Sequence, residues 1–442
     1  MKPMKFLPLA VLALAPQLAL AQEAAPSAVP GEQTAYIFTT FLFLVGGFLV
    51  FWMAAGFAML EAGLVRSKNV ATQLTKNISL FSIAVIMYYL MGYAIMYPDD
   101  DGWMIKGLLG SFGVTSLEPV GLAPEAADLG YASAGSDFFF QIMFCATAAS
   151  VVSGTLAERI KLWPFLAFVV VLTGLIYPIQ ASWVWGGGWL SEMGFSDFAG
   201  STLVHAVGGF AALAGAIVLG PRIGKYGKNG SVQPFPGSNL ALATLGTFCL
   251  WLGWFGFNGG SQLAMGTVSD VTDVSRIFAN TNAAAAAGAV AALVLTQLRY
   301  GKVDLTMVLN GALAGLVAIT AEPLYPSLTE ATLIGAIGGV IVVFTVPLLD
   351  KLKIDDVVGA IPVHLVAGLW GTFVAAWSNP DVTYGVQLLG FVSIGAFVFV
   401  LSFVAFTVLK ATIGLRVSPE EEANGIDVAE LGLEAYPEFA KG

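Results

Sequence analysis

Long apolar windows recur along the whole chain and are separated by short polar connections. The windows that are long enough to cross about 30 Å of hydrocarbon fall at residues 36–65, 77–97, 136–157, 162–180, 200–221, 239–258, 274–298, 305–321, 331–349, 357–377 and 386–413. An apolar run of this length predicts a membrane-spanning helix. The pattern therefore predicts an all-α polytopic membrane protein with eleven transmembrane helices.

The composition agrees with this pattern and excludes other classes of protein. Apolar residues make up 57% of the chain and charged residues only 11%, whereas about a quarter of the residues in a soluble domain are charged. This excludes a soluble enzyme. The formal net charge of −10 argues against nucleic acid or an anionic membrane surface as a partner, because both require a basic face. Cys145 and Cys249 lie in apolar runs, and we interpret both as buried packing residues.

The N-terminus has the pattern of a secretory signal peptide. In residues 1–21, two lysines precede an apolar stretch that ends in Ala19-Leu20-Ala21, a typical cleavage site. We expect this segment to be removed; insertion as an uncleaved extra helix is the alternative. Residues 22–35 are then an extracytoplasmic N-terminal segment that leads into the first span.

Positive residues gather in alternate connections between the windows and in the tail. These are Arg66, Lys68, Lys76, Arg159, Lys161, Arg222, Lys225, Lys228, Arg299, Lys302, Lys351, Lys353, Lys410, Arg416 and Lys441. Cytoplasmic loops carry such an excess of Lys and Arg. We therefore predict a multi-pass protein of the inner (plasma) membrane with its N-terminus outside and its C-terminus in the cytoplasm.

The two histidines of the chain, His205 and His364, both fall inside predicted spans. An ionisable side chain is costly in hydrocarbon and normally faces a partner or a cavity. Each histidine has Val one residue before it, Val two residues after it and Gly four residues after it. We interpret the two as equivalent positions of a five-helix repeat, with copies at 36–221 and 239–377. The eleventh helix, 386–413, and a cytoplasmic tail, 414–442, follow.

An odd number of spans in each copy makes the repeat inverted, so that its functional site lies near the midplane. We therefore expect His205 and His364 to meet there and to titrate as a pair. Three alternatives exist: a hydrogen bond that only holds the helices together, a heme and a metal site. Nearby residues suit neither heme propionates nor a metal, and we expect no cofactor and no metal.

Several motifs, in this order along the chain, resemble the ammonium transporter family, the Amt branch of the Amt/Mep/Rh superfamily. They are FQIMFCAT (140–147), SGTLAERIK (153–161), WGGGWL (185–190), DFAGSTLVH (197–205), GWFGFNGGS (253–261), IDDVVGAIPVH (354–364) and GLRVSPEEEANGID (414–427). The resemblance covers essentially the whole mature chain. It implies a homotrimer of eleven-helix protomers, each with its own pore, and a transporter or channel for nitrogen assimilation that is not an enzyme.

The resemblance also assigns roles by position. It implies an outer recruitment site (Trp185, Phe144 and Ser261, supported by Asp197), an aromatic gate (Phe144 and Phe257) and twin histidines in the pore (His205 and His364). Aromatic faces attract ammonium through cation–π interaction, and a serine oxygen accepts an N–H. A bare cation would not cross apolar walls, so we expect deprotonation near the gate, conduction of ammonia and co-transfer of the proton.

Two alternatives stay open for the function, and one partner is implied for the tail. An ammonium sensor of the same fold is one alternative, and a neutral Rh-type ammonia channel is the other. The resemblance implies an ordered cytoplasmic tail, packed across protomers, that binds a P-II signal-transduction protein; a disordered acidic end is the other interpretation. The sequence departs from the family pattern in two places: no histidine follows Glu430, and Gly359 stands where many relatives carry an acidic residue or a nearby proline.

Overall fold

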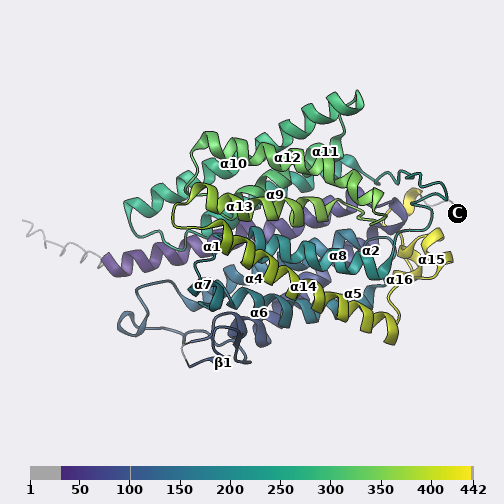
Figure 1. Cartoon of the computed structure of the whole chain (residues 1–442). Coiled ribbons are helices and arrows are strands. Elements are labelled where there is room, and N and C mark those ends of the chain that lie inside the picture. Colours follow the sequence, from purple (N-terminus) through teal and green to yellow (C-terminus); the bar gives the residue numbers. More distant parts are fainter. Residues whose placement is uncertain (1–30, 100, 440–442) are drawn as a thin grey trace, which may run out of the picture.

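The computed structural model describes residues 31–439 except residue 100, so the predicted signal peptide lies outside the described residues. Ten helical segments in this part of the chain are long and apolar enough to cross a membrane. They are α1 (Gly31–Leu64), Ser67–Met96, α4 (Ala134–Thr155), Leu162–Ser182, Ser201–Leu219, α9 (Leu240–Gly260), α10 (Val268–Tyr300), α12 (Leu328–Lys351), Ile361–Ser378 and α14 (Tyr384–Thr412). The predicted all-α membrane architecture is thus confirmed, and Figure 1 shows the helices running side by side.

The helix in the eighth predicted window is shorter than the others. This helix, α11 (Leu305–Thr320), is apolar and has 16 residues. At 1.5 Å per residue it is about 24 Å long, less than the thickness of the hydrocarbon core. The count of eleven spans therefore stays a prediction.

Four of the ten segments are not continuous α-helices. They divide into η1 (Ser67–Asn69), α2 (Val70–Met87), η2 (Tyr88–Gly92) and α3 (Tyr93–Met96); α5 (Leu162–Val171), η4 (Leu172–Ile176) and α6 (Tyr177–Ser182); η5 (Ser201–Ala206) and α8 (Val207–Leu219); and η6 (Ile361–Val366) and α13 (Ala367–Ser378). The segments η2, η4, η5 and η6 are π-helical. Such turns are rare and frequently occur at functional sites.

The connections and the tail contain only short elements. On one side of the bundle lie a two-stranded antiparallel hairpin, β1 (Trp103–Ile105) and β2 (Leu109–Gly110), η3 (Pro124–Ala126) and α7 (Trp189–Glu192). On the other side lie the tail elements α15 (Pro419–Asn424), α16 (Ile426–Leu431) and η7 (Pro437–Phe439). Figure 1 shows β1 and the yellow tail at opposite ends of the bundle.

Glycines allow the first helix of each predicted repeat to pack closely against the other. Gly46 of α1 faces Gly256 of α9, where a Cβ added to Gly256 would lie only 2.5 Å from the carbonyl oxygen of Gly46. Membrane helices often approach through such small residues. The contact between α1 and α9 therefore joins the two halves of the chain.

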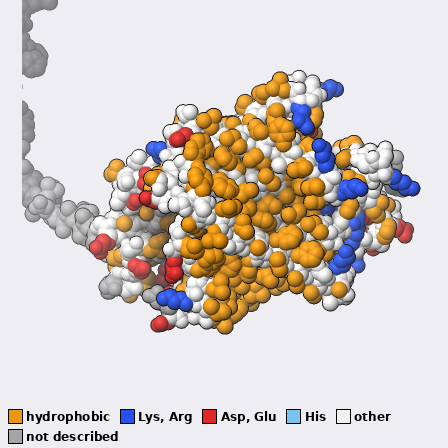
Figure 2. Space-filling view, viewed as in Figure 1, with side chains coloured by type: hydrophobic (Ala, Val, Ile, Leu, Met, Phe, Trp, Pro, Cys, Tyr) orange, Lys and Arg blue, Asp and Glu red, His pale blue; other side chains and the backbone are white. Residues whose placement is uncertain are grey.

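The surface of the bundle suits a lipid environment. Figure 2 shows a broad apolar band between two ends, with most Lys and Arg side chains gathered at the end where the tail lies. One position differs from the sequence-based interpretation: Lys76, counted above among the loop cations, lies inside α2 with no exposed surface. The second helical segment begins at Ser67, about ten residues before the predicted window.

Candidate functional site

The two histidines meet in the middle of the bundle. His205 lies in η5 and His364 in η6, and both side chains are buried. Their Nδ1 atoms are 3.2 Å apart, and the ring planes are inclined by 25°. One Nδ1 must carry a proton and donate it to the other. Among the described residues, the buried Nε2 of His205 has no hydrogen-bond partner, so it can bind a further molecule.

A column of aromatic rings leads from His205 towards one end of the bundle. His205 stacks on Trp254 at 4.8 Å and on Phe257 at 5.2 Å between ring centres. The ring of Phe257 lies 4.1 Å from that of Phe144, and the edge of Phe144 meets Trp185 at 6.0 Å. Phe144 and Phe257 are almost completely buried, so together they close the passage between Trp185 and the histidines.

The other end of this column opens into a pocket of about 390 Å³. Trp185, Phe144 and Ser261 line it, together with Tyr93, Tyr97, Tyr131, Asp137, Phe140, Gln141, Phe198 and Leu263. The Ser261 hydroxyl donates to the carbonyl oxygen of Phe257 at 2.8 Å. Its oxygen lone pairs therefore remain free to accept a hydrogen bond from a molecule in the pocket. The three residues of the predicted recruitment site thus share one pocket.

Asp197 does not line this pocket but holds two of its elements in place. Its carboxylate accepts hydrogen bonds from the backbone N–H groups of residues 200–203 at 2.8 to 3.1 Å, at the start of η5. Its carbonyl oxygen accepts the indole N–H of Trp185 at 2.9 Å. Burial raises the pKa of Asp197 to about 6, while the four backbone N–H groups act in the opposite direction.

One acidic residue of this pocket, Asp137, was not predicted from the sequence. Asp137 in the first turn of α4 is only 5% exposed. It accepts hydrogen bonds from the hydroxyls of Tyr93 at 2.5 Å and Tyr131 at 3.2 Å. Burial and the charge of Asp137 raise the pKa of Tyr131, so that this side chain stays a neutral donor. An aspartate one residue inside a predicted span was the available signal.

The segment before His364 repeats the one before His205. Each histidine follows an aspartate by eight residues and a glycine by five, Asp197 and Gly200 in one case, Asp356 and Gly359 in the other. Both glycines have positive φ, 109° and 81°, which other residues rarely adopt. Asp356 accepts the backbone N–H groups of Gly359 at 3.2 Å and residue 361 at 2.7 Å. Gly359, a departure from the family pattern, therefore allows the positive φ that the backbone needs at this position.

Two cavities continue the path on the other side of the histidines. His364 borders a small cavity of about 10 Å³, which Phe57, Glu61, Asn310 and Val358 also line. A cavity of this size is at the lower limit for one water molecule. A larger cavity of about 340 Å³ lies beyond it, and both are lined by Asn310 and Val358. The Asn310 amide donates to the carbonyl oxygen of Val358 at 3.0 Å.

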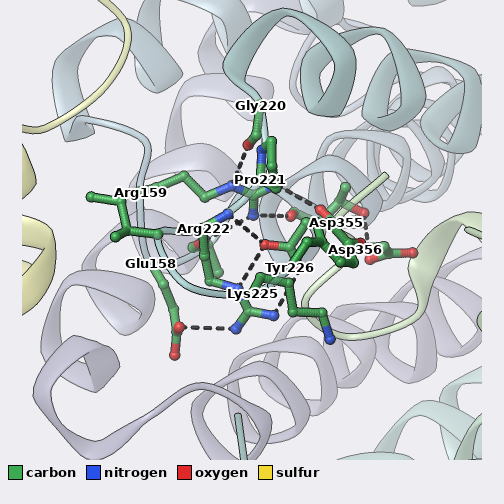
Figure 3. Close-up of polar contacts among 12 residues, drawn as sticks. Glu158, Arg159, Gly220, Pro221, Arg222, Lys225, Tyr226, Asp355 and Asp356 are labelled. Carbon is green, nitrogen blue, oxygen red and sulfur yellow. Dashed lines mark hydrogen bonds and ion pairs between the residues drawn. The ribbon is translucent and has the colours of Figure 1, made fainter. Parts of the chain in front are cut away.

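A buried ion network surrounds the larger cavity. Arg222 binds both carboxylate oxygens of Asp355 at 2.8 and 2.9 Å and donates to Glu158 at 2.9 Å, as Figure 3 shows. Arg159 donates to the backbone carbonyls of Gly220 and Asp355. Burial alone would raise the pKa of Asp355, but the hydrogen bond from Arg222 and the charges of Arg159 and Arg222 hold it far below its usual range. The network joins the connections after α4, after α8 and before η6.

The tail packs on the same end of its own chain. Asp427 accepts the first backbone N–H groups of α2 at 2.7 and 2.9 Å. Further contacts join Ile426 N to Asn69, Ile223 N to Glu422, Leu162 N to Glu430, and Arg416 to Glu422. These contacts hold residues 416–430 of the tail against the bundle. Glu430, after which the histidine of the family pattern is missing, thus accepts a hydrogen bond from the backbone N–H of Leu162.

Comparison with known proteins gives one consistent result. A family model described as the Ammonium Transporter Family matches residues 41–436. The ammonium transporter Amt2 of Archaeoglobus fulgidus is 44% identical over 90% of this chain and 87% of its own. A putative ammonium transporter of Synechocystis is 40% identical over 98% and 97%.

Solved structures agree with the sequence comparisons. A protein named Sensor Amt Protein has 36% identity and a TM-score of 0.83, and the match covers 90% of this chain and all of that one. Mep2 of Candida albicans has 26% identity and a TM-score of 0.77, with 93% of each chain covered. From these matches we conclude that the chain belongs to the ammonium transporter family.

Proposed function

We propose that this protein transports ammonium by binding it at the outer pocket, removing its proton and conducting ammonia past the twin histidines. The observation that carries the proposal is the continuous row of Trp185, Phe144, Phe257, His205 and His364 between two cavities. Each residue type in this row suits the species that would reach it.

The outer pocket suits a small cation that donates hydrogen bonds. Ammonium over the faces of Trp185 and Phe144 gains about 2 kcal/mol of cation–π attraction when it is desolvated. The free lone pairs of Ser261 accept one N–H, and Asp137 adds a negative charge beside the pocket. Potassium donates no hydrogen bonds, so these contacts favour ammonium over it.

Below the aromatic gate, the path suits a neutral molecule. Phe144 and Phe257 leave no polar group for a cation, which would lose its hydration there at a cost of many kcal/mol. Ammonia can accept a hydrogen bond from the histidine pair or donate one to it, because each imidazole has one donor and one acceptor nitrogen. The pair can also take up the proton on an imidazole nitrogen that carries none.

An ammonium jump on sealed proteoliposomes tests this function. We expect a transient current with ammonium and none with an equal potassium jump, because the proton crosses together with ammonia. Alkalinisation of the lumen without a current would instead indicate a neutral channel of the Rh type. Equal currents with both cations would contradict selective transport.

Replacing Asp137 by asparagine should weaken ammonium recruitment. The loss of one negative charge beside the pocket should raise the ammonium concentration for half-maximal current by roughly three- to tenfold, with little change in the maximal current. The measurement is a concentration series of ammonium jumps. Asp128→Asn, which removes an exposed carboxylate of the same loop region, is the matched control. An equal shift in both variants would assign the effect to the general surface charge.

Ammonium sensing is the second candidate function. It is favoured by the TM-score of 0.83 with the protein named Sensor Amt Protein. A sensor would bind ammonium at the same outer pocket without moving charge across the membrane. Ammonium binding without either current or alkalinisation would therefore favour this alternative.

We also propose an assembly, an orientation and a partner. Three chains form a homotrimer with one pore in each protomer, in the inner membrane, built from two inverted five-helix copies. The matching aspartate, glycine and histidine spacings before His205 and His364 support the repeat. The basic end that bears the tail is the cytoplasmic end, in keeping with the excess of Lys and Arg in cytoplasmic loops. There the ordered acidic tail offers a surface for a P-II protein.

A further inference from the structure

A carboxylate and an ammonium group lie inside the first two helical segments, and the proposed transport cycle gives neither of them a role. Glu61 near the end of α1 is 1% exposed, and Lys76 in α2 is not exposed at all. Ionisable side chains inside a membrane protein are costly and generally mark ion or proton pathways. The pair therefore requires an explanation.

Neutral donors hold one oxygen of Glu61. Its Oε2 accepts hydrogen bonds from the amides of Gln73 and Asn77, the latter at 2.9 Å, and from the Ser153 hydroxyl at 3.1 Å. Lys76 does not bond to Glu61 within the described residues. Its Nζ donates to the carbonyl oxygen of Ser153 at 3.1 Å and lies 4.9 Å from the centre of the Phe165 ring. Lys76 thus balances the charge of Glu61 without occupying its oxygens.

The other oxygen of Glu61 faces the path. Among the described residues, no hydrogen bond reaches Oε1. A Cβ added to Gly154 would lie 2.9 Å from Oε1 and 2.5 Å from Val358, so both side chains border the space beside Gly154. Glu61, Val358 and His364 all line the small cavity next to the twin histidines. One carboxylate oxygen is therefore free at the point where the path leaves His364.

We propose that Glu61 accepts the proton that leaves the twin histidines and passes it to the inner cavity, a role that rests on the proposed function. A protonated imidazole of the pair gives its proton, through one water molecule in the small cavity, to the Glu61 carboxylate. The imidazole becomes neutral and Glu61 becomes a carboxylic acid. Release of the proton towards the larger cavity, which Arg222, Lys225 and Asp356 line, restores the carboxylate. Lys76 keeps Glu61 negative between cycles.

Proteoliposomes with Glu61→Gln test this role through two readouts, the ammonium current and lumenal alkalinisation. Glutamine keeps the shape and can accept the same hydrogen bonds, but it takes up no proton. We expect the current to fall roughly tenfold or more, as for the loss of a proton-transfer group, while ammonia that now crosses without its proton alkalinises the lumen. Ser82→Ala, which removes an exposed hydroxyl of α2 that bonds only within its own helix, is the control and should conduct as the wild type does.

The double variant Glu61→Gln/Lys76→Met separates proton transfer from charge balance, because it leaves no unpaired charge in the core. We expect it to assemble normally and to remain without current. Wild-type current in the double variant, or in Glu61→Gln itself, would overturn the proposal. A wild-type protein that alkalinises the lumen without current would also overturn it, yet would leave ammonia conduction intact. A wild-type protein with neither signal would contradict the proposed function itself.

Discussion

Replacing His364 or His205 by alanine is expected to reduce the selective ammonium current by one to two orders of magnitude. Each substitution removes one ring of the buried pair whose Nδ1 atoms are 3.2 Å apart. The remaining imidazole loses its buried partner, and the migrating molecule loses a donor or an acceptor, at a cost of about 1 to 3 kcal/mol. That cost corresponds to a roughly ten- to hundredfold slower transfer.

Currents after equal ammonium and potassium jumps measure this effect. Cys145→Ala is the matched control, because Cys145 is a small buried residue of α4 whose thiol contacts the carbonyl oxygen of Thr173 at 3.6 Å and not the histidines. The control should keep both the ammonium current and the exclusion of potassium. Unchanged current and unchanged selectivity in both histidine variants would contradict a role of the pair in conduction.

Replacing Asp355 by alanine should cause the largest loss of stability. It leaves the guanidinium of Arg222, only 4% exposed, without its bidentate partner. Removing one member of such a buried pair typically costs about 3 to 5 kcal/mol. The apparent melting temperature of the protein in detergent should fall by roughly 5 °C or more.

The control and the pH dependence identify the cause of this loss. Lys225→Ala removes a partly exposed ion pair with Asp350 at 3.5 Å on the same end of the bundle, and such pairs contribute less than about 1 kcal/mol. The pKa of Asp355 is lowered in the folded protein. Its contribution to stability is therefore complete above its unfolded pKa near 4. It is lost as the pH falls through the folded value. A melting temperature equal to that of Lys225→Ala at pH 7 would contradict the prediction.

Ten of the predicted spans are confirmed, and they could be predicted from the sequence because the hydropathy signal is local. An apolar run identifies a membrane helix without knowledge of its neighbours. The motifs around Trp185, Phe257 and His205 lie far apart in the sequence, and in the fold these residues lie in one row of ring contacts. The spacing of Asp356, Gly359 and His364 matches that of Asp197, Gly200 and His205 and is equally visible in the sequence.

Glu61, Lys76 and Asp137 were missed because their burial depends on distant residues. A lysine next to other cations in the sequence resembles a loop residue. The beginning of the second segment is buried by α16, more than 350 residues away, through Asp427. Asp137 has one partner close in the sequence, Tyr131, but its other partner, Tyr93, belongs to the second helical segment. Local hydropathy contains no information on such contacts.

The aspartates before the two histidines also have a consequence for the electric field in the path. The segments that begin at η5 and η6 run in opposite directions, since the end of α8 and the start of η6 are joined by Arg222 and Asp355. Each helix N-terminus carries about half a positive elementary charge, and each histidine lies in the segment that follows one of these termini. Asp197 and Asp356 cap these termini. A molecule that arrives from either face therefore meets a helix dipole whose positive end is already neutralised.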